Sequence, residues 1–141
     1  MSEHEFINAA KAPTVAYNMK DWDGVKAAIT AGFVYDEVGM QRKLEGPDKM
    51  IAAWQVWAMA FPDFHATFEN AYVGGGKVVL ELTWHGKHTG PMQTPGGEIP
   101  ATGKSIEMRA CQIIEIEGGK ANSILHYFDM MTMMQQLGLA G

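Results

Sequence analysis

The 141 residues, of which 47% are hydrophobic and 19% charged, suffice for one domain over residues 1–141 with a sizeable core, and they exclude a disordered chain. The net charge of −5 and the scattered lysines and arginines disfavour binding to nucleic acid or to an anionic membrane surface. No apolar run reaches the roughly 18 residues that span a bilayer, and the acidic N-terminus is unlike a secretory signal. With Cys111 as the single cysteine, we expect a reducing, cytoplasmic location.

The N-terminal segment is expected to be helical. Glu3–Asn18 favours a helix that Pro13 should kink or split, because proline lacks the N–H that a helix interior needs. Asp21 can cap a second, short helix that Gly32 ends. The chain should therefore begin with two helical pieces before its first strand.

A strand and a long helix should follow. Aromatic and β-branched residues predict a strand over Phe33–Val38, and the polar stretch Gly39–Glu45 reads as a connection. A helix should open at Gly46 and stop at Pro62, because its large apolar residues recur at helical spacing. These residues form one stripe: Met50, Trp54, Trp57 and Phe61.

The pattern then changes to the alternation that is typical of strands. Phe64–Glu69 and Lys77–Thr89 should pair across a glycine turn at residues 74–76. Gly90–Thr102, rich in proline and glycine, should be a loop, and Met130–Leu137 a closing helix.

A β-hairpin is expected between that loop and the closing helix. Its arms are Lys104–Ile116 and Lys120–Phe128, joined by a three-residue turn that pairs Ile116 with Lys120. Even-numbered residues of both arms then share one face, which is typical of a small-molecule pocket and equally of a core that contains a satisfied histidine. That face holds Met108, Ala110, Gln112, Ile114, Ile116, Asn122, Ile124, His126 and Phe128.

Tight turns between consecutive long strands predict a largely antiparallel, twisted sheet. Helices should cover one of its faces, which gives an α+β domain. A curved sheet around helices leaves a cone with an open end.

Several stretches resemble, in the same order, the segments of one family. They are Tyr17-Asn18 with Asp21-Trp22-Asp23, Ala53-Trp54 to Ala60-Phe61-Pro62-Asp63, Gly86 to Pro91, Ile99 to Lys104, and Tyr127-Phe128-Asp129 with Gln136-Leu137-Gly138. Over nearly its whole length the chain thus resembles the SnoaL-like polyketide cyclases. The resemblance implies the nuclear-transport-factor-2-like fold, a cone-shaped, mixed but mostly antiparallel sheet with helices on its concave face. It also implies a homodimer. It implies no single reaction, because this fold hosts cyclases, isomerases, epoxide hydrolases and non-enzymes.

The family's cyclases close a ring by aldol condensation with no metal or cofactor, using an Asp at the end of the last strand. Asp129 matches the family's Tyr-Phe-Asp ending, whereas the hairpin parity places His126 inward. A histidine can serve as the base, since its ordinary pKa of about 6.5 is close to neutrality. The alternatives are a helix cap for Asp129 and a core histidine for His126.

Other polar and aromatic residues could serve the same site. Gln112 could orient the base or a carbonyl oxygen, and Tyr35 could donate to an oxyanion. Each could equally be a packing or anchoring residue. The expected substrate-binding set is His88, Trp84, Tyr35, Trp54, Met108 and Asn18.

We therefore expect a cofactor-independent enzyme that moves protons on an apolar, carbonyl-bearing or cyclic small molecule. No metal is expected, since no His, Cys and Asp cluster has ligand spacing. One alternative is an epoxide hydrolase, which needs a carboxylate–arginine network, but Arg109 falls on the opposite face. The other is a binding protein without chemistry. Apolar residues on that outer face, near Cys111 and Ile113, predict the homodimer interface.

Overall fold

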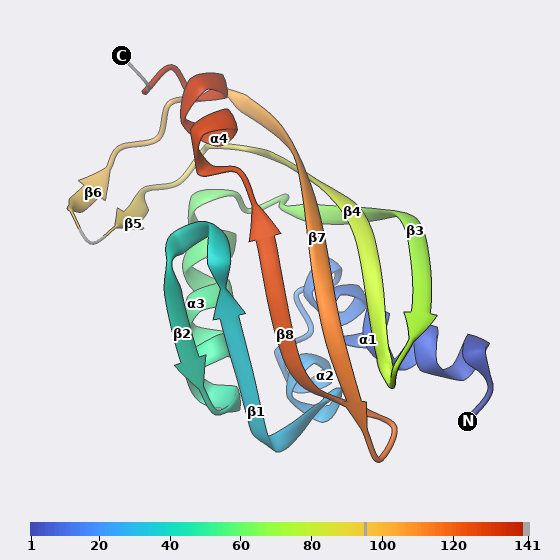
Figure 1. The fold of residues 1–141 in the computed structure, drawn as a ribbon. Coiled ribbons are helices and arrows are strands. Elements are labelled where there is room, and N and C mark those ends of the chain that lie inside the picture. Colours follow the sequence, from blue (N-terminus) through green and yellow to red (C-terminus); the bar gives the residue numbers. More distant parts are fainter. Residues whose placement is uncertain (95, 140–141) are drawn as a thin grey trace.

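The computed structural model describes residues 1–94 and 96–139, in which one large sheet carries three helices on one face (Figure 1). The six strands lie in the order β2-β1-β8-β7-β4-β3. β1 and β8 pair in parallel and all other neighbours are antiparallel, so the predicted mixed, mostly antiparallel α+β fold is confirmed. The elements of this layer are α1 (Glu3–Asn18), α2 (Trp22–Ala27), β1 (Ile29–Glu37), β2 (Arg42–Glu45), α3 (Pro47–Ala60), β3 (His65–Gly74), β4 (Lys77–Lys87), β7 (Ser105–Glu117), β8 (Lys120–Phe128) and α4 (Met130–Gln136).

The helices form where their caps predict. Ser2 and Glu5 make a reciprocal capping box at the start of α1, and the helix continues through Pro13 without being split. Asp21 accepts a hydrogen bond from the Gly24 N–H at the start of α2, as expected. This helix ends at Ala27 rather than at Gly32, because β1 already begins two residues later.

The region between α2 and α3 holds more strand than its sequence predicts. β1 covers Ile29–Glu37, and the expected connection Gly39–Glu45 contains part of a 3-10 turn, η1 (Val38–Met40), and all of β2. β1 gains its extra length by pairing with β8, some ninety residues later in the chain. Local sequence patterns carry no trace of such a distant partner.

The central hairpin has a shorter turn than expected. Gly118 and Gly119 have φ values of 58° and 79°, which suits a two-residue turn, and Glu117 pairs with Lys120. A register shift then leaves Asn122 without a paired residue, so Gln112 lies opposite His126 instead of Ile124. The difference of two residues preserves parity beyond the shift, so Ile124, His126 and Phe128 remain on the inner face. Before the shift Ala121 is buried in the core, so the prediction of an inward Asn122 is wrong.

The expected loop Gly90–Thr102 contains two short strands, β5 (Met92–Thr94) and β6 (Gly97–Ile99). They form a separate small hairpin at the same end of the molecule as α4 (Figure 1). Gly90 fixes the start of this segment against α3, because a Cβ there would lie 2.0 Å from the Met59 carbonyl oxygen. Only glycine allows this approach.

The core fills the space between the sheet and α1 to α3. At its centre the Tyr17 ring meets Trp22, Trp54 and Trp84 edge-on, with centroids 5.2–5.6 Å apart. Such edge-to-face pairs are favourable beyond the area they bury. Within residues 1–94 and 96–139, no helix combines the length and apolar character that crossing a membrane requires.

Candidate active site

An aromatic cavity lies between the sheet, α1 and α3. We call it the inner cavity, and it encloses about 310 Å³ of empty space including its opening. The volume open to the centre of a water molecule is about 20 Å³, close to what one water needs. Its wall consists of Tyr17, Tyr35, Trp54, Trp57, Phe64, Trp84 and Phe128, with Met108, Glu37 and His126.

His126 is held in the wall by both of its ring nitrogens. The Trp84 indole N–H donates to Nε2 at 3.2 Å, and the Tyr35 hydroxyl oxygen lies 2.7 Å from Nδ1. Because an indole nitrogen can only donate, Nε2 carries no proton. Burial lowers the pKa of His126 to about 3, so the ring is neutral and its one proton is on Nδ1, pointing to Tyr35.

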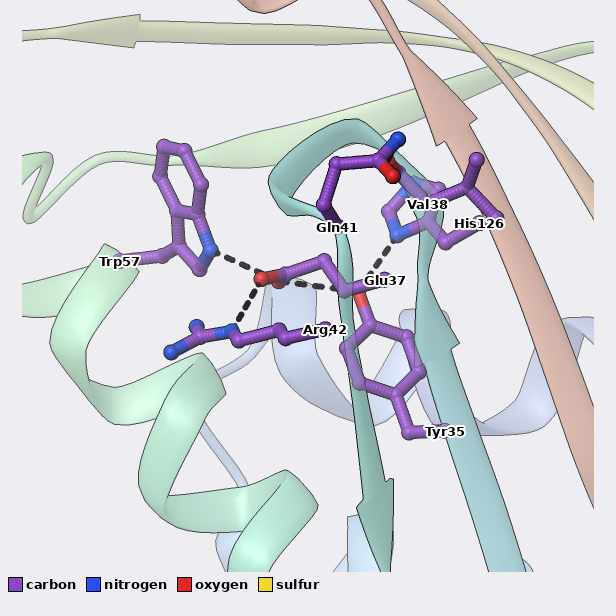
Figure 2. Close-up of polar contacts among 7 residues, drawn as sticks. All are labelled: Tyr35, Glu37, Val38, Gln41, Arg42, Trp57 and His126. Carbon is purple, nitrogen blue, oxygen red and sulfur yellow. Dashed lines mark hydrogen bonds and ion pairs between the residues drawn. The ribbon is translucent and has the colours of Figure 1, made fainter. Parts of the chain in front are cut away.

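Tyr35 connects His126 to a carboxylate through two hydrogen bonds. Its oxygen accepts from His126, and its hydroxyl donates to Glu37 Oε2 at 3.3 Å (Figure 2). Burial, and next the charge of Glu37, raise the pKa of Tyr35 well above its ordinary value. The result is a relay, Trp84–His126–Tyr35–Glu37, in which every donor points toward the carboxylate.

Glu37 has no exposed side-chain surface, yet both of its oxygens are satisfied. The Trp57 indole N–H donates to Oε2 at 3.1 Å, and Arg42 Nε donates to Oε1 at 2.6 Å (Figure 2). A buried carboxylate needs such partners, because losing its hydration costs several kcal/mol. Glu37 therefore brings a compensated negative charge to the end of the relay.

Four of the sequence-predicted residues surround His126 as expected. Trp84, Tyr35, Trp54 and Met108 all line the inner cavity, and Trp84 and Tyr35 contact the imidazole directly. They come from four elements, β1, α3 and the adjacent strands β4 and β7. Strand parity accounts for Trp84 and Met108, whereas Trp54 follows from the helical stripe of α3 and Tyr35 from the pairing of β1 with β8.

Gln112 lies beside His126 on the neighbouring strand but has a different partner. Its amide donates to Thr14 Oγ1 of α1 at 3.5 Å, and Gln112 is absent from the cavity wall. Among the described residues it makes no hydrogen bond to His126. The structure thus does not bring Gln112 to the position of an orienting group.

Asp129 lies outside the inner cavity, at the start of α4. It accepts hydrogen bonds from the Met131 N–H at 2.9 Å and the Thr132 hydroxyl at 2.8 Å. The Thr132 bond is the main reason that the pKa of Asp129 is lowered. This is the geometry of an exposed helix cap, the alternative that its position in the sequence left open.

His88 and Asn18, expected at the cavity, are structural anchors instead. His88 is fully buried against the Phe61 ring, and its Nδ1 accepts from the Thr102 N–H at 3.2 Å. Burial lowers the pKa of His88, opposed in part by the Gly90 carbonyl. Asn18 makes two hydrogen bonds to the Ala66 backbone, tying α1 to β3.

The sequence reading missed Glu37, Arg42 and Tyr17. Glu37 follows Phe33 and Tyr35 at a spacing of two, so a carboxylate on the apolar face of a strand was the available signal. Arg42 was hidden in the presumed connection. Tyr17 lines the cavity, and its buried hydroxyl has no partner among the described residues, a fact that only packing reveals. In the same part of the chain, no three His, Cys, Asp or Glu side chains cluster as metal ligands.

Comparisons with solved structures support the same architecture. TsrD from Streptomyces laurentii matches with a TM-score of 0.82 at 24% identity, over 99% of this chain and 98% of that one. A protein of ketosteroid isomerase-like fold from Catenulispora acidiphila, solved with trimethylamine, gives 0.78 at 16% identity, over 93% and 92%. An LEH-like epoxide hydrolase from M. tuberculosis gives 0.72 at 22% identity, over 95% and 90%. At these identities the likeness concerns the fold alone.

Comparison with sequences identifies the family. No curated protein matches the chain. The family model described as SnoaL-like polyketide cyclase matches residues 8–137, which is nearly the whole sequence. The chain therefore belongs to the SnoaL-like polyketide cyclase family.

Proposed function

We propose that the protein is a cofactor-independent enzyme that transfers a proton on an apolar, carbonyl-bearing small molecule, as a cyclase or an isomerase does. His126 is the group that exchanges the proton with the substrate. The observation that carries the proposal is the relay Trp84–His126–Tyr35–Glu37 in the wall of an otherwise aromatic cavity. Titratable groups with shifted pKa values in an apolar pocket are typical of a catalytic site.

In the proposed step, Nε2 of His126 takes a proton from the carbon next to the carbonyl group. The imidazolium that forms is stabilised through its Nδ1–H by Tyr35, which donates to Glu37. A pKa of about 3 makes the empty site a weak base, but an enolate formed beside the ring supplies the negative charge that raises it. The enolate then takes the proton back from His126, or it attacks a second carbonyl, whose oxygen takes that proton as the new carbon–carbon bond forms.

Two donors are suited to the enolate oxygen. The Trp84 indole N–H must release the lone pair of Nε2 before that nitrogen can take a proton, and it then becomes available to the substrate. Tyr17 brings a buried hydroxyl that has no partner among the described residues. Donors placed where negative charge develops are typically worth more than about 2 kcal/mol to the transition state.

The test is deuterium exchange at the carbon next to the carbonyl, followed by NMR for a panel of cyclic ketones in D₂O. We expect the parent protein to accelerate exchange for part of the panel. His126→Gln, which retains polar contacts but cannot act as a base, should lose about 10²–10⁴ in rate. Asp129→Ser, which keeps a capping side chain, is the matched control and should exchange like the parent. Unchanged exchange in His126→Gln would contradict the assignment of the base.

A second candidate is an epoxide hydrolase, favoured by one specific observation. The Glu37–Arg42 pair supplies the carboxylate–arginine network that this reaction needs, beside space for about one water. Arg109, in contrast, is exposed on the opposite face of the sheet. Incubation with cyclic epoxides in H₂¹⁸O separates the two candidates. Label in a diol product that disappears in Glu37→Gln, without ketone exchange in the parent, would favour hydrolysis.

A further inference from the structure

A second cavity adjoins the inner cavity on the other side of Trp57. We call it the outer chamber, and it is lined chiefly by Met40, Arg42, Trp57, Met92 and Met130. These residues come from η1, β2, α3, β5 and the start of α4. The chamber encloses about 300 Å³ of empty space including its opening. The volume open to the centre of a water molecule is only about 20 Å³ in either cavity, so side chains must move before a larger ligand can enter.

The wall between the two cavities is held by hydrogen bonds. Trp57 lines both cavities, and its indole N–H donates to Glu37. Glu37 belongs to the inner cavity, whereas Arg42, which donates to it, belongs to the outer chamber. A turn of the Trp57 side chain would break this hydrogen bond and the contacts of its ring with Phe61, Phe64 and Phe128, and it would join the two spaces.

Arg42 uses only part of its donor capacity in this wall. Its Nε donates to Glu37, and among residues 1–94 and 96–139 neither terminal nitrogen has a hydrogen bond or ion pair. Figure 2 shows the terminal nitrogens beyond the Glu37 carboxylate, on the side of Trp57. The Arg42 side chain is 37% exposed, so these donors are open to a ligand.

The surroundings of these donors favour one ligand chemistry. A guanidinium can bind a second carboxylate while it holds the first, because its five N–H groups point in different directions. The methionines nearby supply adaptable apolar contacts rather than competing charge. An apolar molecule with an acidic end matches both properties.

We propose that the outer chamber is a second substrate subsite, in which Arg42 binds the carboxylate of a molecule whose apolar, carbonyl-bearing part occupies the inner cavity. This substrate class rests on the proposed function, and it adds a requirement for an acidic group. Arg42 is then the residue that determines specificity, and Trp57 is the partition that must turn to admit the substrate.

Binding of a matched pair of probes tests the subsite. We would titrate the parent protein with 2-naphthylacetic acid and with its methyl ester by calorimetry. We expect the acid to bind about 10–100-fold more tightly, the range that a hydrogen bond to a charged group supplies. Equal affinities, or no binding of the acid at millimolar concentration, would overturn the proposal.

Variants identify the residue responsible. Changing Arg42 alone leaves a buried carboxylate unpaired, so the deciding variant is the double substitution Glu37→Gln with Arg42→Gln. It should bind acid and ester equally, with folding checked by thermal melting. Arg109→Gln, which removes an exposed arginine on the opposite face, should keep the preference. A preference for the acid that survives in the double variant would overturn the role of Arg42.

The subsite and the proposed reaction can fail separately. His126→Gln should retain the preference for the acid while losing exchange, because it leaves the outer chamber intact. A parent protein that prefers the acid but exchanges no ketone would contradict the reaction and support the subsite. A parent protein that exchanges ketones but binds acid and ester equally would support the reaction and contradict the subsite.

Discussion

His126 and Glu37 show how two titratable side chains can be kept in one apolar wall. Three donors, from Tyr35, Arg42 and Trp57, surround the carboxylate. The imidazole stays neutral because burial disfavours its charged form and so lowers its pKa. Tyr35 stands between the imidazole and the carboxylate. A direct bond would have favoured a permanent imidazolium. Tyr35 therefore separates the imidazole of His126 from the carboxylate of Glu37 while linking the two through hydrogen bonds.

The low pKa of His126 predicts a pH-dependent stability. Its pKa is about 3 when folded against an ordinary value of about 6.5, so between these values the unfolded chain binds a proton that the folded chain refuses. The free energy of unfolding should therefore fall by roughly 2 kcal/mol from about pH 7.5 to pH 5 through His126 alone. His126→Gln should remove this part of the pH dependence in urea denaturation.

His4→Gln provides the control for that measurement. His4 is exposed near the start of α1, so its loss should leave the pH dependence of the parent. Part of the slope should persist in His126→Gln, because burial also lowers the pKa of His88. If His126→Gln kept the full slope, His126 would not be the buried neutral group described above.

Prediction from sequence succeeded where parity alone decides a residue's place. Even-numbered residues of β4, β7 and the later part of β8 face inward, so His126, Trp84 and Met108 were placed correctly although the hairpin register was not. It failed for His88 and Asn18, because a polar side chain at an inward position can bond to nearby backbone or loop groups instead. Sequence does not show which of these partners is present.

At the scale of elements, η1 packs against Phe128, a residue of the inner-cavity wall, through one close approach. A Cβ on Gly39 would lie 2.5 Å from the Phe128 ring, so η1 packs directly on that ring. Gly39→Ala should force Phe128 to shift and cost about 1–3 kcal/mol of stability, the usual range for overpacking. Urea denaturation checks the cost.

Gly32→Ala is the matched control for this change. Gly32 lies in β1, where a Cβ would meet nothing within 4 Å. Its substitution should leave stability within about 0.5 kcal/mol of the parent, as is usual for surface positions. Equal stability of the two variants would show that Phe128 accommodates the methyl group freely.

Elements with local signals were predicted well, and those with distant partners were not. α3 and the β3–β4 and β7–β8 hairpins follow from helical stripes, alternation and glycine turns. The strands β2, β5 and β6 are each only three or four residues long, which is too short for periodicity to identify them. The parallel pairing of β1 with β8 depends on tertiary packing. Because this pairing was not predicted, the position of Glu37 beside His126 was not predicted either.

At the scale of the molecule, the outer face of the sheet remains the predicted site of homodimerisation. Ile113 and Leu125 are paired across β7 and β8 there and are only half-buried. Burying such a pair against a second copy would remove apolar surface from water. Leu125→Lys should shift sedimentation from dimer to monomer at micromolar concentration. Val15→Lys, at an exposed site on α1, should remain dimeric like the parent, and a monomeric parent would end this prediction.

The pairing of β1 with β8 has a consequence for the order of folding. Tyr35 and His126, whose contact joins the relay, are 91 residues apart in sequence. While the chain is being synthesised, β1 and β2 must wait for β8, so the sheet can close only after nearly all of the chain has been made. Closing so long a loop is slow compared with forming local hairpins. The relay and the inner cavity should thus be the last parts to assemble, and a nascent or partly folded chain should lack both.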